Sequence, residues 1–289
     1  MHTLTRRNFV KAASGAALSG AAIALAGCGS SEAEDAGSAA ETAASGATTI
    51  TVGASPSPHA EILGAVTDLL ADEGYELEIV EYSDYVQPNV AVDDGSLDAN
   101  YFQHYPYLEQ YNEENGTDLA NAGAIHFEPM SVYSDKHDSI EDVPDGARIA
   151  VPSDATNEAR ALMLLEAHGI IGLAEGAGLA ATGNDIVDNP HNIELYETEA
   201  ASVPRSLADV DFAVVNGNYA LSSGIVDDHE ALAAEDADSE AAQTYANIVC
   251  CRAGEEESDK VAALVAALQS DTVRDFIEET YQGTVITVF

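Results

Sequence analysis

The sequence has 289 residues, and 51 aspartates and glutamates oppose 10 lysines and arginines, giving a formal net charge of -41. A surface this acidic repels nucleic acid and anionic lipid, which argues against a nucleic-acid-binding protein. Because 46% of the residues are hydrophobic and patterned, a globular fold is favoured over disorder. We interpret the acidity as adaptation to high salt, typical of a halophile, because salt screens the repulsion within an acidic shell.

Residues 1–27 have the organisation of an export signal. Arg6 and Arg7 precede a run of small and apolar residues, and paired arginines indicate the twin-arginine (Tat) route. The segment Leu25-Ala26-Gly27-Cys28 resembles a lipobox, so Cys28 is expected to become the first mature residue and to carry lipid. The alternative is a membrane-spanning helix, but the run is too short and too rich in glycine and serine for one.

Residues 28–47 contain no aromatic and no large aliphatic residue. They cannot offset the entropy of ordering, so we predict a flexible, lipid-anchored tether. The mature protein is therefore expected on the extracytoplasmic face of the cell membrane. Residues 48–289 are long enough for one large domain or two lobes.

The first elements after the tether predict a strand, a helix and a strand. Ile50 and Val52 alternate with polar residues, and residues 75–82 form a second strand pattern. Between them a helix is predicted to open at Ser57 and Pro58 and to end at Gly74. Its apolar residues have helical spacing and are Ile62, Leu63, Val66, Leu69 and Leu70. This order predicts a parallel sheet with helices on its faces.

The remaining pattern is α/β throughout. Helices are predicted over 104–114, after Ser153 up to Gly169, and over 258–269 and 271–281, with a short helix start at 139–142. A turn is predicted at 144–146. Strands are predicted over 147–153, 193–197, 211–216 and 246–252.

Besides Cys28, the chain has two adjacent cysteines, Cys250 and Cys251. Neighbours on a strand point to opposite faces, so we predict two buried thiols rather than a vicinal disulfide or a metal site.

Sequence signatures of catalysis are absent. The chain has no HExxH, GxSxG, Walker or Rossmann glycine motif, so no enzyme and no cofactor are predicted. His59, His104 and His126 could gather around a metal, as in a metal-capturing lipoprotein, but their spacing is not diagnostic.

Several motifs carry a resemblance to a known family, in matching order and approximate spacing from residue 50 almost to the end. They are DYVQPN from Asp84, LDANYFQH from Leu97 with PYL from Pro106, EPM from Glu128 with Tyr133-Ser134, IAVPSD from Ile149 with Thr156-Asn157 and Arg160-Ala161-Leu162, PRSL from Pro204, VNGNYA from Val215 and YANIV from Tyr245. Together they resemble the methionine-binding lipoproteins of the NlpA type, which serve methionine ABC importers.

The resemblance implies a two-lobed, periplasmic-binding-protein-like fold of type II, with the ligand in the cleft between the lobes. It implies lobe one at 48–134 plus 248–289 and lobe two at 135–247, closing around the ligand by hinge motion. It also implies capture of L-methionine and delivery to the permease and ATPase subunits of an ABC importer.

A methionine pocket needs a cation for the carboxylate, oxygen acceptors for the ammonium and an apolar slot for the thioether. By resemblance, Arg160 binds the carboxylate, and Asn216 and Asn247 lie at the ammonium and carboxylate edges. Four further residues match positions near the ligand side chain: Tyr85, Phe102, His104 and Tyr133. The structural alternatives are core packing for Tyr85 and Phe102, capping of the next helix for His104, and packing between lobes for Tyr133.

The chain departs from the family pattern in two places. Gly217-Asn218 replaces bulkier residues, and the acidic segment 224–244 matches poorly and is interpreted as a variable loop. We expect neither to touch the motif positions. They leave open another amino acid or a short peptide as the ligand.

Overall fold

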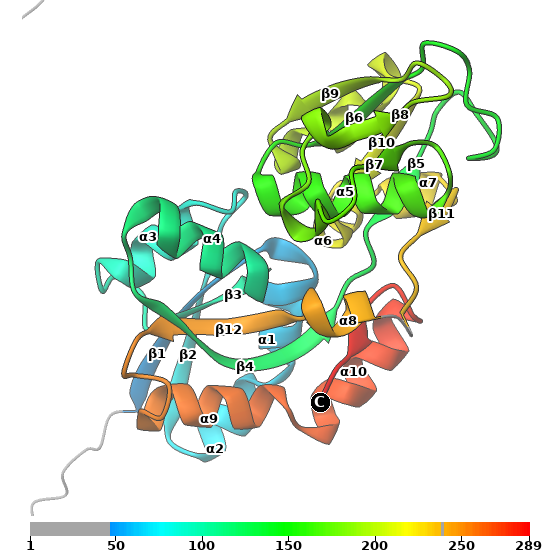
Figure 1. Ribbon diagram of the computed structural model, residues 1–289. Helices are drawn as coiled ribbons and strands as arrows, with labels where there is room; N and C mark the ends of the chain where they lie inside the picture. Colours follow the sequence, from blue (N-terminus) through cyan, green and yellow to red (C-terminus); the bar gives the residue numbers. More distant parts are fainter. Residues whose placement is uncertain (1–46, 238–239) are drawn as a thin grey trace, which may run out of the picture. The chain divides into compact units, whose positions relative to one another are not determined.

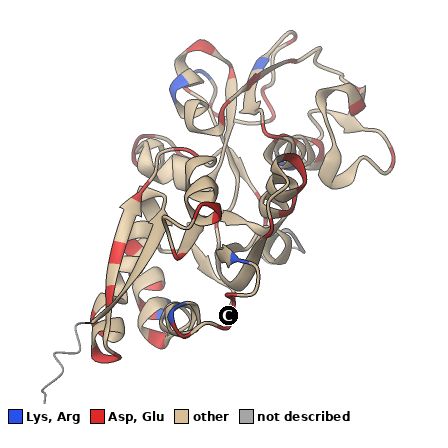
Figure 2. Ribbon diagram, turned by 90° about the vertical axis from the view of Figure 1, so that its left-hand side faces the viewer, with Lys and Arg blue, Asp and Glu red and all other residues tan. Residues whose placement is uncertain are grey.

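A computed structural model describes residues 47–237 and 240–289 (Figure 1). Arg6, Arg7 and Cys28 lie outside the described residues. Among the described residues, no helix is both long and apolar enough to cross a membrane. Acidic residues are spread over helices, strands and loops, whereas basic residues are few (Figure 2).

The first part of the fold, here called lobe one, is built on a six-stranded sheet in the order β13-β4-β12-β3-β1-β2. The strands are β1 (Thr48–Ala54), β2 (Tyr75–Glu81), β3 (Ala99–His104), β4 (Leu119–Phe127), β12 (Asn247–Arg252) and β13 (Ile286–Thr287). β1 runs parallel to β2 and β3, whereas β12 is antiparallel to β3 and β4. The sheet is therefore mixed, although strand-helix-strand order alone predicts a parallel one.

Helices cover both faces of this sheet (Figure 1). One face packs against α1 (Glu61–Ala65), α2 (Thr67–Asp72), α9 (Asp259–Leu268) and α10 (Asp271–Tyr281). The other packs against α3 (Gln87–Asp93) and α4 (Tyr105–Asn115). Adjacent residues divide between the two cores because side chains alternate along a strand: Val249 joins the first and Cys250 the second. Cys250 and Cys251 are buried free thiols, which confirms that prediction.

The second part, lobe two, is built on a five-stranded sheet in the order β11-β5-β10-β6-β9. The strands are β5 (Ser131–Tyr133), β6 (Arg148–Pro152), β9 (Glu194–Thr198), β10 (Phe212–Val215) and β11 (Ala233–Ala234). Helix α5 (Ala155–Ala167) packs on one face, and α6 (Gly217–Ser222), α7 (Ile225–Asp228) and the short turns Ala200–Ser202 and Pro204–Asp209 pack on the other. Two short strands, β7 (Gly172–Leu173) and β8 (Ile186–Asp188), form a separate antiparallel sheet. In the sequence they lie between α5 and β9.

The chain passes between the sheets twice. The first crossing is residues 128–130, between β4 and β5, and the second is residues 235–246, which contain α8 (Glu240–Thr244). The boundary expected at residue 134 is wrong because β5 pairs with β10 and β11 of lobe two. Asn247, expected to end lobe two, is instead the first residue of β12.

Two helix predictions need correction. The helix predicted from Ser57 to Gly74 is divided: Ser57 is extended, and Val66 (φ −104°, ψ 2°) separates α1 from α2. The break follows Gly64 and falls on a β-branched residue, and both residue types weaken a helix. The helix start predicted at 139–142 is a turn, closed by Asp142 N to Ser139 O at 3.3 Å. Pro144 holds the preceding residue extended and stops propagation.

Candidate functional site

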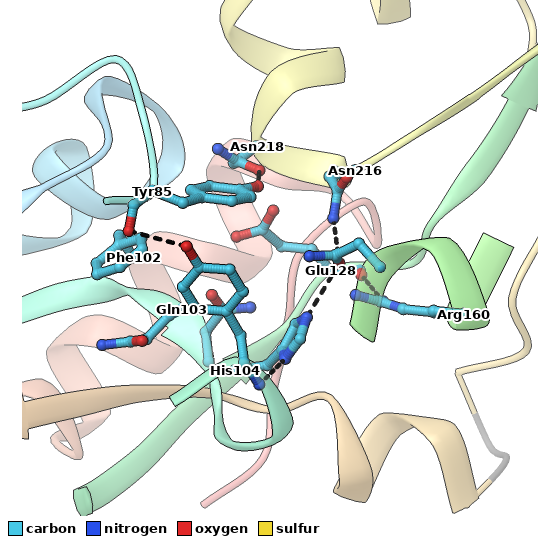
Figure 3. Close-up of a pocket in the computed structure, with 12 residues that line it drawn as sticks. Tyr85, Phe102, Gln103, His104, Glu128, Arg160, Asn216 and Asn218 are labelled. Atoms are coloured by element: carbon cyan, nitrogen blue, oxygen red, sulfur yellow. Dashed lines mark hydrogen bonds between the residues drawn. The ribbon is translucent and has the colours of Figure 1, made fainter. Parts of the chain in front are cut away.

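A small pocket lies between the lobes, with walls from both of them (Figure 3). Its lining comprises Tyr85, Phe102, Gln103, His104, Tyr107, Glu128, Asn157, Arg160, Asn216, Gly217, Asn218 and Asn247. The lining therefore brings together all the predicted ligand-binding residues except Tyr133. Its volume of about 20 Å³ accommodates roughly one water molecule, so this conformation of the pocket is closed.

The lobe-one wall comes from the end of β3 and the segment after β2. His104 is the last residue of β3 and the N-cap of α4, where its Nδ1 accepts a hydrogen bond from Tyr107 N at 3.2 Å. His104 therefore caps α4 and lines the pocket at the same time. Its Nε2 lies 3.0 Å from Asn157 Oδ1 on lobe two, which makes His104 a neutral ring that donates across the cleft. Burial and the charge of Arg160 lower the pKa of His104 to about 3.

Aromatic rings form the apolar side of the pocket. Tyr85 lies 5.6 Å from both Phe102 and Tyr107 and 4.9 Å from Tyr219, between ring centroids. The Tyr85 hydroxyl donates to Asn218 Oδ1 at 2.5 Å, which links the lobes. A thioether would meet ring faces and edges here, as sulfur prefers.

Tyr133 does not reach the pocket. Side chains alternate along β5, so Val132 enters the core under α5 while Tyr133 enters the opposite core of lobe two. It is 4% exposed and belongs to a buried hydrophobic cluster of lobe two, against which Tyr85 of lobe one also packs. Its predicted ligand contact therefore has no support from the geometry.

The lobe-two wall begins with the first turn of α5, whose N-cap is Asp154. Asn157 and Arg160 are three residues apart and therefore share one helix face. Asn157 Oδ1 accepts a bond from Asn216 Nδ2 at 2.7 Å in addition to its contact with His104. Asn157 belongs to a matched motif but was not predicted to line the pocket. Its position one helical turn before Arg160 places it on the same helix face, and this spacing could have indicated the role.

Arg160 is buried and already has an anionic partner. Its Nε and Nη2 donate to the two carboxylate oxygens of Glu235 at 2.8 and 2.6 Å, and its guanidinium lies 4.4 Å from the Tyr245 ring centre. Burial alone would lower the pKa of Arg160, but Glu235 outweighs it and the net direction is upward. The expectation that segment 224–244 avoids the motif positions is wrong, because Glu235 belongs to this segment and binds Arg160.

The second departure also touches the site. A Cβ on Gly217 would lie 2.6 Å from Glu128 Cβ and 2.9 Å from Glu128 Oε2. Glycine at this position therefore lets the Glu128 side chain lie against the start of α6. Since Asn218 accepts the bond from Tyr85, both members of the Gly217-Asn218 pair shape the pocket.

We expect Gly217→Ala to displace Glu128, to lower the free energy of unfolding by about 1–3 kcal/mol and to weaken ligand binding. Chemical denaturation and ligand titration measure the two effects. Gly64→Ala is the matched control, because a Cβ at Gly64 meets nothing within 4 Å. Equal behaviour of the two variants would contradict the close contact at Gly217.

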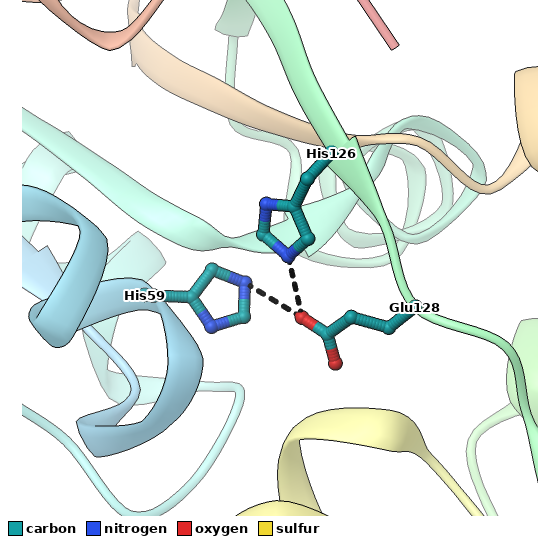
Figure 4. A group of neighbouring side chains, drawn as sticks. All are labelled: His59, His126 and Glu128. Atoms are coloured by element: carbon teal, nitrogen blue, oxygen red, sulfur yellow. Dashed lines mark hydrogen bonds and ion pairs between the residues drawn. The ribbon is translucent and has the colours of Figure 1, made fainter. Parts of the chain in front are cut away.

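Behind the pocket, His59, His126 and Glu128 form a buried cluster (Figure 4). Glu128 Oε1 lies 2.7 Å from His126 Nε2 and 3.4 Å from His59 Nε2. His59 Nε2 also lies 2.9 Å from Asn247 Oδ1, which fixes the Asn247 amide at the pocket. The donor set would suit a divalent cation, but the nitrogens facing Glu128 have hydrogen-bond partners within the chain. His104 is not part of this cluster.

Burial sets the protonation of the cluster. It lowers the pKa of His59 to about 4 and that of His126 to about 3, so both rings are neutral near pH 7. Burial raises the pKa of Glu128, while His59, Arg160 and the Asn218 backbone N–H oppose that shift. Glu128 was part of a matched motif, but nothing local in the sequence indicated that it faces the pocket.

The sequence profile of the NlpA lipoprotein family matches residues 50–289. The chain belongs to the NlpA lipoprotein family. It is 40% identical over 240 residues to the methionine-binding lipoprotein MetQ of Bacillus subtilis, covering 81% of this chain and 86% of the relative. It is 39% identical over 212 residues to the D-methionine-binding lipoprotein MetQ of Salmonella typhimurium, covering 73% and 77%.

A solved structure agrees with this NlpA-family assignment. A nutrient-binding protein from Burkholderia cenocepacia bound to methionine is 41% identical, with a TM-score of 0.79, covering 83% of this chain and 100% of that one. The predicted α/β two-lobed substrate-binding fold is confirmed by this similarity. This NlpA-family chain is a substrate-binding lipoprotein rather than an enzyme.

Proposed function

We propose that this NlpA-family lipoprotein captures methionine in the pocket between its lobes and delivers it to the permease and ATPase of an ABC importer. The observation that carries the proposal is the convergence of Arg160, Asn216, Asn247 and the aromatic wall on one cavity. Arg160 would receive the ligand carboxylate, because a guanidinium matches that group in charge and geometry. Oxygens of Glu128 and of the asparagine side chains would accept from the ammonium.

The closed pocket must expand to take an amino acid. A second cavity of about 330 Å³ lies on the other side of Tyr85 and shares Tyr85 and Tyr107 with the pocket. Tyr85 is therefore the wall between the two, held by its bond to Asn218 and by Tyr107 OH, which donates to Tyr85 O at 3.2 Å. Opening of the lobes, with release of the Tyr85 bond to Asn218, would admit the ligand.

The first test is calorimetric titration of L-methionine into residues 29–289 in multimolar salt, after unfolding and refolding to remove bound ligand. We expect saturable binding at one site, with other amino acids much weaker. D-methionine and short methionine peptides belong in the same panel, because the chain matches relatives that are named for different forms of the ligand. Response to another amino acid or a peptide alone would keep the binding function and replace the ligand.

Metal capture is the rival function, and within the described part of the chain only the His59–His126–Glu128 cluster favours it. A scan of divalent cations by the same titration separates the two. Methionine binding that is unchanged by a chelator supports the amino-acid proposal. Tight binding of one cation with no response to any amino acid would replace it.

We further propose that Cys28 carries the lipid anchor and that Arg6 and Arg7 direct Tat export. Cys28→Ser should leave the protein in the soluble fraction of the exported material, whereas the unaltered protein sediments with membranes. Cys250→Ser is the matched control, because this buried thiol is remote in sequence from the export signal. Membrane retention of Cys28→Ser would refute the anchor.

A further inference from the structure

Glu235 is held at Arg160 by more than one contact. Its carboxylate accepts both Arg160 Nε and Nη2 in a bidentate pair, and Oε2 also accepts Met130 N at 2.8 Å. The side chains of Arg160 and Glu235 are only 4% and 9% exposed. Charged bidentate bonds of this kind, shielded from water, fix orientation as well as adding energy.

The Arg160–Glu235 pair also joins both crossings between the lobes. Arg160 Nη2 donates to Glu128 O at 2.8 Å, and Met130 N donates to Glu235, so the first crossing contributes both of these contacts. Glu235 itself opens the second crossing, directly after β11. The central cation of the pocket is thus fastened to the two segments about which lobe motion must occur.

The bonds leave a defined part of the guanidinium for a ligand. Glu235 uses the edge formed by Nε and Nη2, Nη2 also donates to Glu128 O, and Nη1 donates to no described residue. Stacking on the Tyr245 ring at 4.4 Å restrains rotation of the same plane. A guanidinium held in this way presents its Nη1 donors in a fixed direction, which reduces the entropy lost when a carboxylate binds.

We propose that Glu235 is a positioning residue that orients Arg160 for the carboxylate of the bound amino acid. The proposal rests on the function proposed above and adds a residue from the weakly matched segment to it. The opposing role would be competition, in which Glu235 must leave Arg160 before a ligand carboxylate can bind. Its additional bond to the Met130 backbone favours a fixed partner over a displaced one.

The experiment compares two ligands, L-methionine and L-methionine amide, which lacks the carboxylate. Titrations use the unaltered protein, Glu235→Gln and the control Glu230→Gln, which removes an exposed carboxylate from the same segment. We expect Glu235→Gln to weaken methionine binding at least about tenfold and amide binding less than about threefold, with Glu230→Gln unchanged. The preference for the carboxylate ligand would thus shrink in Glu235→Gln alone.

Other outcomes overturn the proposal. Equal weakening for both ligands would mean that Glu235 only supports the fold, and tighter methionine binding would mean that it competes. If the unaltered protein binds neither ligand, the proposed function itself fails and this inference fails with it.

Glu235→Asp provides a second variant if the glutamine protein does not fold. The shorter side chain keeps the charge but cannot reach Arg160 and Met130 together, so an intermediate loss for methionine alone is expected. NMR of the Arg160 guanidinium gives a ligand-free readout: rotation about its Nε–Cζ bond should be slow in the unaltered protein and faster in both variants. Unchanged rotation would overturn the positioning role.

Discussion

Replacing Arg160 with alanine should abolish detectable methionine binding and lower the free energy of unfolding by about 3–5 kcal/mol. Binding is lost because the ligand carboxylate would enter a buried site with no cation, at a cost of about 2–5 kcal/mol. Stability is lost for a separate reason. Glu235 would remain as an unpaired carboxylate, only 9% exposed, with Met130 N as its remaining partner.

A double variant separates these two losses. Arg160→Ala with Glu235→Ala removes both charges, so most of the stability should return while methionine binding should not. Arg205→Ala is the matched control, because Arg205 is exposed in lobe two and makes one contact of 3.3 Å with Ala201 O. Calorimetry and chemical denaturation measure both quantities. Retained methionine affinity in Arg160→Ala would remove this residue from the proposed site.

Much of the fold could be predicted because hydrophobic period is a local property. The alternation in β1 and the helical spacing in α5, α9 and α10 were sufficient to place those elements. Strand β3 was not predicted, because all of its residues are buried and Ala99–His104 therefore shows no alternation between an apolar and a polar face. The short strands β5 and β11 depend on tertiary pairing, because β5 pairs with β10 and β11 pairs with β5. No local sequence pattern indicates these pairings.

The site residues that belong to matched motifs could be predicted from the sequence, whereas residues that reach the site only through tertiary packing could not. Arg160, Asn216 and Asn247 were identified by resemblance, and the structure brings them to one cavity. Glu235 was not predicted, because it is 75 residues from Arg160 in the sequence and belongs to a segment that matches the family poorly. The role of Gly217 depends on the approach of Glu128 from the first crossing between the lobes, which the residue type at position 217 does not indicate.

The pH dependence of stability should be steep on the acid side of neutrality. Burial is the first cause of the lowered pKa of His59, about 4, and of His104 and His126, each about 3. All three rings are neutral in the folded chain at pH 5, whereas the same rings take up protons in the unfolded chain below about pH 6.5. Stability is therefore lost as the pH falls from about 6.5 toward the folded pKa values.

The expected size is about 1.4 kcal/mol per pH unit for each ring, or roughly 4 kcal/mol per unit for the three near pH 5. Three carboxyls act in the opposite direction. Burial raises the pKa of Glu128, Asp154 and Glu158, so their folded forms bind protons before their unfolded forms do and offset part of the loss. Multimolar salt should be present throughout, because it screens the change in repulsion as the acidic surface is protonated.

Chemical denaturation at pH 7, 6, 5.5 and 5 measures how steeply the free energy of unfolding changes with pH. One substitution then tests how much of this slope comes from a single histidine. His104→Gln removes one buried ring and should reduce the slope by about one third, or roughly 1.4 kcal/mol per unit. His168→Gln is the control, because His168 is exposed at the end of α5. An unchanged slope in His104→Gln would mean that this ring is already charged in the folded protein. His104 would then be a second cation beside Arg160, and the pocket would favour anionic ligands over the zwitterionic amino acid proposed here.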